Sequence, residues 1–150
     1  MKASKKKSGF ICQHCGYWVS KNQFIGTHFR NHCPNCLYSK HLDEGKSGDR
    51  QALCRGLMEP IGLTFKHEGV DKYGHPRQGE LMIIHHCSQC GDFSINRLAA
   101  DDQTEMVMLI FKQSTDLPSD IKKTLQAQDI ELLNDKNEAE IKNQLFGKKV

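Results

Sequence analysis

Cysteines are the residues of this chain with the clearest chemistry, and six of the seven fall into three Cys-x2-Cys pairs. The pairs are Cys12/Cys15, Cys33/Cys36 and Cys87/Cys90, while Cys54 stands apart. An odd number of cysteines, in a sequence without a recognisable export signal, fits a disulfide framework poorly. We therefore expect thiolates that bind a metal, because two such pairs supply the four ligands of a tetrahedral Zn²⁺ site.

The first two pairs have the spacing of a zinc ribbon. Seventeen residues separate Cys15 from Cys33, which falls within the interval of 15–20 that is typical of such sites. Gly16 lets the chain turn back beneath a metal, and Pro34 stiffens the second pair. The spacing predicts one zinc site formed by Cys12, Cys15, Cys33 and Cys36.

The third pair needs two more ligands to complete a second site. Cys54 is the one thiol left to supply the third ligand. We favour His41 as the fourth, because it follows the second pair closely and no cysteine adjoins it. Other histidines lie beside Cys33 or Cys87 and are alternatives to His41: His32, His85 and His86. The cysteine count thus predicts two structural Zn²⁺ ions per chain.

A different grouping of the ligands is also compatible with the sequence. The spacing of Cys12, Cys15, His28 and His32 reproduces a C2H2 finger, and Cys33, Cys36, Cys87 and Cys90 would then form the other site. Gly26 counts against it, because glycine within the helix of such a finger costs about 1 kcal/mol relative to alanine. Both groupings require two zinc ions.

The elements that must position these cysteines are short. Residues 10–100 are rich in turns, and the apolar runs 10–11, 61–65 and 81–84 predict short strands. Three glycines and a proline between residues 68 and 79 predict the loop of a hairpin that joins two of them. We expect antiparallel pairing, as in zinc-ribbon folds.

The composition changes after Asp101 and Asp102, because the remaining residues contain no cysteine, no histidine and a single glycine. Their apolar spacing near 3.6 predicts three helices. The first carries its apolar side at Met106, Val107, Leu109 and Ile110 and stops at Leu117-Pro118. The second starts at Ser119 as N-cap and carries Ile121, Leu125, Ile130, Leu132 and Leu133. The third starts at Asn137, with Glu140 completing a capping box and an apolar side of Ile141, Leu145 and Phe146.

The predicted fold class is therefore α+β, with three parts along the chain. Residues 1–9 form a flexible basic arm, since they carry four lysines and nothing that could build a core. Residues 10–102 form a small zinc-ribbon or knuckle-type domain with short antiparallel strands and two zinc sites. Residues 103–150 form a helical C-terminal extension, which we expect to be separable because it holds no candidate ligand.

The run from Arg30 to Asp43, RNHCPNCLYSKHLD, resembles the RNHCP domain, a small bacterial family named for its first five residues. The resemblance covers about residues 10–102. It includes the first Cys-x2-Cys-Gly, the segment Gly48-Asp49-Arg50, Cys54, and the third Cys-x2-Cys-Gly followed by Asn96-Arg97. It implies a zinc-binding domain and includes His41 but not His28 in the pattern, which favours the first grouping. It implies no particular activity.

Charge is distributed unevenly along the chain. Residues 1–55 hold 10 Lys/Arg against 3 Asp/Glu, whereas residues 101–150 hold 7 against 10. Basic loops on a metal-fixed frame suit contacts with nucleic-acid phosphates. The candidate contacts are Lys2, Lys5, Lys6, Lys7, Lys21, Arg30, Lys40, Arg50, Arg55 and Arg97. Aromatic residues interleaved with them either stack on bases or pack around the zinc: Tyr17, Trp18, Phe24 and Phe29.

These features predict a structural-zinc RNA-binding protein, with ribosomal RNA as the favoured partner. The alternative is a zinc-stabilised adaptor whose acidic C-terminal helices dock a protein. Enzyme templates fit poorly, since a zinc deaminase needs His-x-Glu before its cysteines and a ββα-metal nuclease needs a histidine after His86. No apolar run approaches the roughly 18 residues of a membrane span, so we expect no membrane partner and a cytoplasmic location.

Overall fold

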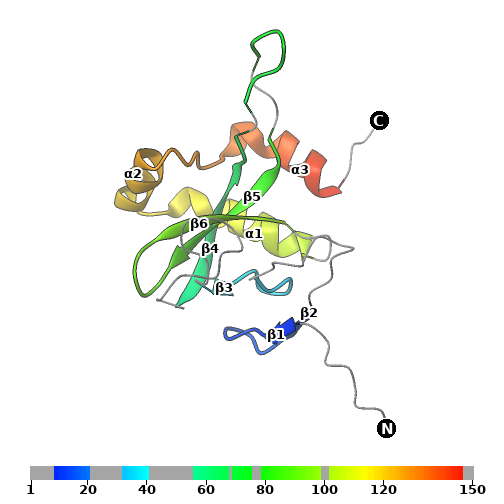
Figure 1. The fold of residues 1–150 in the computed structure, drawn as a ribbon, viewed down its shortest axis with the longest axis vertical. Coiled ribbons are helices and arrows are strands. Elements are labelled where there is room, and N and C mark those ends of the chain that lie inside the picture. The colour runs from blue at the N-terminus through cyan, green and yellow to red at the C-terminus, as the bar shows by residue number, and fades with distance from the viewer. Residues whose placement is uncertain are drawn as a thin grey trace.

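The computed structural model describes residues 9–20, 32–40, 56–67, 69–75, 79–98 and 102–146 (Figure 1). Of the predicted basic arm, only Gly9 belongs to the described residues. Several predicted site residues also lie outside them: Lys2, Lys5, Lys6, Lys7, Lys21, Arg30, His41, Arg50, Cys54 and Arg55. His28, Phe24 and Phe29 lie outside as well.

Six described strands form two antiparallel sheets. Strands β1 (Gly9–Ile11) and β2 (Trp18–Ser20) make a two-stranded ribbon. Strands β3 (Ser39–Lys40), β4 (Leu57–Phe65), β5 (Leu81–Cys87) and β6 (Phe93–Arg97) form a four-stranded sheet in that order. β4 pairs with β5 on either side of the predicted hairpin loop, so that prediction is confirmed.

Three α-helices and two 3₁₀ helices follow the sheet. They are α1 (Thr104–Gln113), η2 (Ser114–Asp116), α2 (Ser119–Ala127), η3 (Asp135–Asn137) and α3 (Glu138–Phe146). The mixed α+β class with antiparallel strands and a helical C-terminal part is confirmed.

The helical segment buries both faces of the four-stranded sheet. Leu63 pairs with Ile83 and Gly62 with Ile84, and successive residues of a strand point to opposite faces. One buried cluster contains Leu63 and Ile83, and the other contains Ile84. The first joins the sheet to α1, α3 and the second cysteine pair through Leu37, Leu81, Val107, Ile110, Phe111, Leu133 and Ile141. The second joins it to α2 through Leu125, with Ile121, Ile130 and Leu132 beside it.

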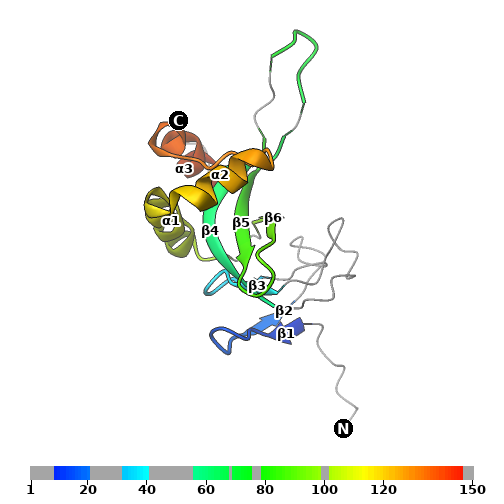
Figure 2. The ribbon, with the colours of Figure 1, turned by 90° about the vertical axis from the view of Figure 1, so that its left-hand side faces the viewer.

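The predicted boundary after residue 102 therefore crosses a shared hydrophobic core. Figure 2 shows the helices beside β4 and β5, while the β1–β2 ribbon lies at the opposite end of the molecule. Strands β4 and β5 carry apolar residues on both faces, which must be covered, and the helical segment supplies the cover.

The helices depart from prediction in detail. α2 ends at Ala127, so Ile130, Leu132 and Leu133 lie in an extended segment instead of on the helix. Asp129 has a positive φ of 62°, and the Ile130 N–H donates to the Leu125 carbonyl oxygen at 2.9 Å. This is a Schellman ending, which stops a helix by local geometry.

The predicted caps are also displaced by a few residues. Ser119 is the first residue of α2 and makes no capping hydrogen bond there. The capping box lies at Asn134 and Asn137, one turn before the predicted one, and opens η3. Among the predicted apolar residues, Leu109 and Phe146 are exposed.

Candidate metal centre

The first two Cys-x2-Cys turns, which we call knuckles, have the same backbone structure. In the first knuckle the Gly16 N–H donates to the Cys12 carbonyl oxygen at 2.9 Å, and the Cys12 N–H donates to the Tyr17 carbonyl oxygen at 2.9 Å. The His14 N–H points at the Cys12 sulfur, 3.4 Å away. Gly16 has a φ of +81°, a conformation that glycine adopts without strain.

The second knuckle has the same hydrogen bonds, but a leucine stands at the position of the glycine. Leu37 and Cys33 donate to the carbonyl oxygens of Cys33 and Tyr38 at 2.8 and 2.9 Å, and the Asn35 N–H lies 3.3 Å from the Cys33 sulfur. Leu37, at φ +66°, takes the place of the glycine. Its side chain is buried in the core that α1 and β5 share.

The two knuckles bring four sulfur atoms together. The Sγ atoms of Cys12, Cys15, Cys33 and Cys36 all lie within 4.8 Å of one another. Cys12 and Cys36 are 3.6 Å apart, and Cys15 and Cys33 are 3.7 Å apart. A regular tetrahedron with Zn–S distances of about 2.3 Å has S···S edges of about 3.8 Å. The cluster is therefore spaced to hold one metal ion.

The protonation of these thiols also favours a cation at their centre. Burial, with the neighbouring cysteines, raises the pKa of Cys33 to about 11 and that of Cys36 still further. For the exposed Cys15, desolvation is outweighed by hydrogen bonds from the Tyr17 amide and the Asn35 side chain, which lower its pKa to about 7. Crowded thiols resist a second and third negative charge, and a divalent ion removes that penalty.

Aromatic and aliphatic side chains enclose the sulfur cluster. Val19 is fully buried against the cysteines, with Phe10 and Tyr38 packed beside it. The His14 ring stacks on Tyr38 at a centroid distance of 3.6 Å. This is the grouping that the ribbon spacing predicts, because Cys33 and Cys36 lie with Cys12 and Cys15 and not with Cys87 and Cys90.

A buried polar network ties the second knuckle to the rest of the fold. His32 Nε2 lies 2.8 Å from Asp102 Oδ2, and His85 Nε2 donates to the Leu37 carbonyl oxygen at 2.7 Å. The Asn96 amide donates to His85 Nδ1 at 2.8 Å. Burial, followed by the field of His32, lowers the pKa of His85 to about 3, so this ring is neutral.

This network gives His32 and His85 a structural role, whereas sequence analysis considered them as alternative zinc ligands. Both ring nitrogens of His85 are engaged, and His32 Nε2 faces a carboxylate. Their ring centroids are 6.1 Å apart. Sequence analysis missed this role, because the partners of each ring are distant along the chain. The one available signal was the placement of polar His85 within an apolar strand.

The third knuckle repeats the two backbone hydrogen bonds and the positive φ of the other two, but a different amide faces its first sulfur. The Gly91 N–H donates to the Cys87 carbonyl oxygen at 3.1 Å, and the Cys87 N–H to the Asp92 carbonyl oxygen at 2.8 Å. The Cys90 N–H lies 3.5 Å from the Cys87 sulfur, and Gly91 has a φ of +83°. Within the described part of the chain, the four-cysteine cluster is the one group of three or more convergent ligands. The predicted partners of this knuckle, His41 and Cys54, lie outside that part.

Two predicted nucleic-acid contacts can be placed. Lys40 is half-buried in β3, at the edge of the four-stranded sheet. Arg97 is exposed on β6, and its Nε lies 3.2 Å from Glu80 Oε2. Tyr17 and Trp18 are exposed beside the first knuckle.

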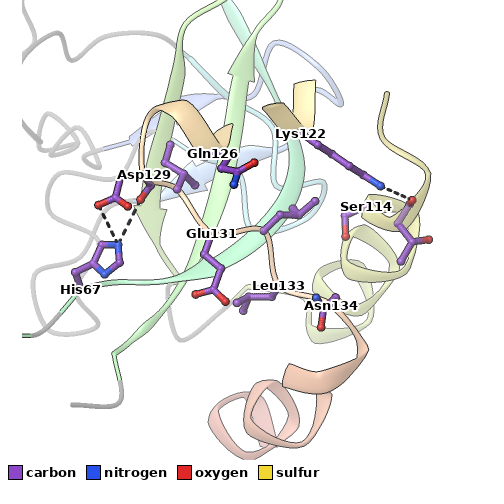
Figure 3. Close-up of a pocket in the computed structure, with 11 residues that line it drawn as sticks. His67, Ser114, Lys122, Gln126, Asp129, Glu131, Leu133 and Asn134 are labelled. Atoms are coloured by element: carbon purple, nitrogen blue, oxygen red, sulfur yellow. Dashed lines mark hydrogen bonds and ion pairs between the residues drawn. The ribbon is translucent and has the colours of Figure 1, made fainter. Parts of the chain in front are cut away.

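A cavity of about 620 Å³ lies far from the cysteines, between α2 and the segment that follows it (Figure 3). Two of its polar lining groups are engaged by neighbouring groups of the protein. His67 Nε2 lies 3.3 Å from the Asp129 carbonyl oxygen, and Lys122 Nζ donates to the Thr115 carbonyl oxygen at 3.1 Å. The lining residues in Figure 3 thus do not converge on one reacting position.

A small α+β fold that gathers four cysteines from two knuckles defines a metal-binding domain. Comparison with known families agrees: the RNHCP domain matches residues 7–108, and the chain belongs to this family. The match extends six residues beyond the predicted limit and into α1. No curated protein and no solved structure matches the chain. None of the described helices has the length and apolar character needed to cross a membrane.

Proposed function

We propose that this chain is a structural-zinc protein that binds RNA, with ribosomal RNA as its target. The observation that carries the metal part is the four-sulfur cluster. Tetrahedral S₄ coordination selects Zn²⁺ or iron, and four protein thiolates leave no open position for a substrate. The metal therefore stabilises the fold, because binding energy at such a site is also folding energy.

The structure of the third knuckle supports a second zinc ion. It repeats the backbone hydrogen bonds and the positive φ of the other knuckles, and the Cys90 N–H lies 3.5 Å from the Cys87 sulfur. A Cβ on Gly56 would lie 3.1 Å from the Cys87 sulfur, so the chain passes this knuckle closely at residue 56. Cys54 precedes Gly56 by two residues and is the third ligand in our proposal, with His41 as the fourth.

Metal analysis of the intact protein tests both sites. We expect two zinc ions per chain by native mass spectrometry. Two matched variants remove one exposed ligand each, Cys15→Ser from the cluster and Cys90→Ser from the third knuckle. Each should retain one zinc ion. If the wild-type chain bound one zinc ion and Cys90→Ser bound the same number, the second site would be excluded and the first would remain.

The RNA part rests on the charge of the front of the chain, where residues 1–55 hold 10 Lys/Arg against 3 Asp/Glu. Phosphate contacts position a protein on RNA, and rigid loops make such contacts with little loss of entropy. We expect the native protein to sediment with ribosomal particles at low salt and to leave them at high salt, because each phosphate contact releases counterions. Sedimentation as a free protein at all salt concentrations would favour the adaptor function.

A further inference from the structure

The two faces of the β1–β2 ribbon differ in what they contact. In the antiparallel register Phe10 pairs with Val19, and Ile11 pairs with Trp18. Cross-strand partners share a face, and successive residues alternate between faces. Val19 is 0% exposed and packs with Phe10 against the cysteines. Ile11 and Trp18, which we call the outer face, are 63% and 44% exposed.

Neither residue of the outer face belongs to a buried cluster of the described residues. The metal cluster is enclosed by the inner face and Tyr38, so the ribbon needs no large apolar residue on its other side. Tyr17, next along the chain, is also 49% exposed. Ile11 and Trp18 thus form an exposed apolar pair on the ribbon, with Tyr17 just before it, and contiguous exposed apolar surface marks binding sites.

The charge of the segments that adjoin the ribbon in the sequence indicates the occupant. The first 42 residues contain seven Lys/Arg and no Asp/Glu, and a Zn²⁺ ion with four thiolates subtracts two, leaving a net charge of +5. Gly9 pairs with Ser20, so the segments that carry Lys7 and Lys21 join the ribbon at the same end. Aromatic rings next to a concentration of cations form the usual platform for single-stranded nucleic acid.

Another exposed aromatic residue, in the loop between β4 and β5, is not next to such a concentration of basic residues. Tyr73 is 72% exposed in the loop between β4 and β5, at the far end of the molecule from the ribbon (Figures 1 and 2). Lys72 Nζ already lies over its ring, 5.3 Å from the centroid. Asp71 beside it accepts hydrogen bonds from the loop's own backbone. This loop therefore serves as a control surface.

We infer that Trp18, with Ile11 beside it, is the platform on which this protein stacks the bases of single-stranded RNA. The inference rests on the proposed RNA-binding function and assigns its surface. In this assignment the lysines next to the ribbon in the sequence bind the backbone phosphates, and the exposed outer face receives a base from any sequence. The contact is therefore tolerant of sequence and specific for unpaired bases.

Trp18 is the one tryptophan in the chain, so its emission reports this surface directly. We would titrate the zinc-loaded full chain with a single-stranded RNA of about 12 nucleotides, a length within the usual site size. Stacking should quench the emission, and a duplex of the same sequence should not. Trp18→Ala should weaken binding, followed by anisotropy of labelled RNA, by roughly 5- to 100-fold. Trp18→Phe should retain most of the affinity, and Tyr73→Ala should leave it unchanged.

The zinc content of each variant is measured alongside, so that a loss of fold is distinguished from a loss of contact. If RNA bound without changing the Trp18 emission, and Trp18→Ala bound it with wild-type affinity, Trp18 would be excluded as the stacking platform. The proposed RNA-binding function would still stand. Equal quenching by duplex RNA would overturn base stacking. Failure of the wild-type chain to bind any RNA at low salt would overturn both proposals.

Discussion

Leu37 adopts a backbone conformation that glycine adopts in the other two knuckles. The equivalent residues are Gly16 and Gly91, with φ values of +81° and +83°, against +66° for Leu37. A residue with a Cβ pays about 1–2 kcal/mol for this conformation. The leucine side chain offsets that cost, because it is fully buried among Leu63, Ile83 and residues of α1. One residue thus connects the metal site to the hydrophobic core.

This double role predicts that the glycine variant at position 37 is more stable than the alanine variant, the reverse of the usual order. Leu37→Ala keeps the backbone strain and loses the packing, and we expect it to cost about 3 kcal/mol. Leu37→Gly loses the same packing but relieves the strain, so it should cost about 1 kcal/mol less. Urea unfolding of the zinc-loaded variants measures both values.

Leu63 is the matched control for this comparison. It is equally buried but lies in β4, where glycine costs roughly 0.5–1 kcal/mol more than alanine. The order of the alanine and glycine variants should therefore reverse between positions 37 and 63. The same order at both positions would show that the conformation of Leu37 is not strained.

The thiol pKa values predict how metal affinity depends on pH. Without metal, Cys33 and Cys36 keep their protons well above neutral pH, while Cys15 titrates near 7. Zinc binds thiolates, so it displaces protons on binding. Its affinity should rise with pH from acid through neutral and beyond, with a slope that is smaller by one proton above about 7, where Cys15 is already ionised. Competition with a chromophoric chelator measures this slope, and a flat profile would mean that the thiols are already ionised.

At the scale of elements, β5 is held to the second knuckle by His85. Its ring satisfies the Leu37 carbonyl oxygen and the Asn96 amide inside the protein. His85→Phe fills the space but leaves the buried Leu37 carbonyl oxygen without its donor, at a cost of about 1–3 kcal/mol. The half-buried Asn96 amide keeps its bond to Ser94 Oγ at 3.2 Å. We expect lower stability in urea and weaker zinc binding at the cluster.

The neighbouring histidine provides the control. His86 is half-buried and stacks on Phe93 at 4.6 Å, on the opposite face of β5. His86→Phe should preserve this stacking and leave zinc affinity at its wild-type value. Equal losses in the two variants would mean that the strand as a whole, and not the His85 hydrogen bonds, supports the knuckle.

Local signals in the sequence were sufficient for some elements and not for others. Apolar runs located β4 and β5, because central strands bury both faces. Cys-x2-Cys spacing located the four-sulfur cluster, since the knuckle geometry is itself local. The end of α2 depended on the left-handed conformation of Asp129, which periodicity does not encode. Asp102 suited a helix start, but its burial beside His32 depends on a contact 70 residues apart.

At the scale of the whole molecule, the helical segment and the metal cluster stabilise the sheet from different sides. The cluster lies at the ribbon end of the molecule (Figure 2). Residues of α1 and α3 pack on one face of β4 and β5, and residues of α2 pack on the other. The helical segment and the cluster meet at the second knuckle, where the Gln103 N–H donates to the Pro34 carbonyl oxygen at 2.9 Å. Sequence analysis treated the helices as separable because they hold no candidate ligand. The positions of metal ligands do not indicate which segments share a hydrophobic core.

Deletion of residues 103–150 should therefore separate metal binding from folding. The four cluster cysteines remain, so we expect the truncated chain to bind zinc there. The deletion also uncovers Leu63, Ile83 and Ile84, which are buried in the full chain. The truncated chain should bind a hydrophobic dye and lose cooperative unfolding in urea, because exposed sheet faces of this kind associate or melt.

A pair of substitutions in α1 makes the same test without truncation. Val107 is fully buried against the sheet, and Leu109 on the same helix is exposed. Val107→Asp places an unpaired charge in the core and should abolish cooperative unfolding, whereas Leu109→Asp should change stability by less than about 0.5 kcal/mol. Zinc bound at the cluster should persist in both, by mass spectrometry under native conditions. A truncated chain that unfolds cooperatively with the stability of the full protein would show that the metal domain needs no helical cover.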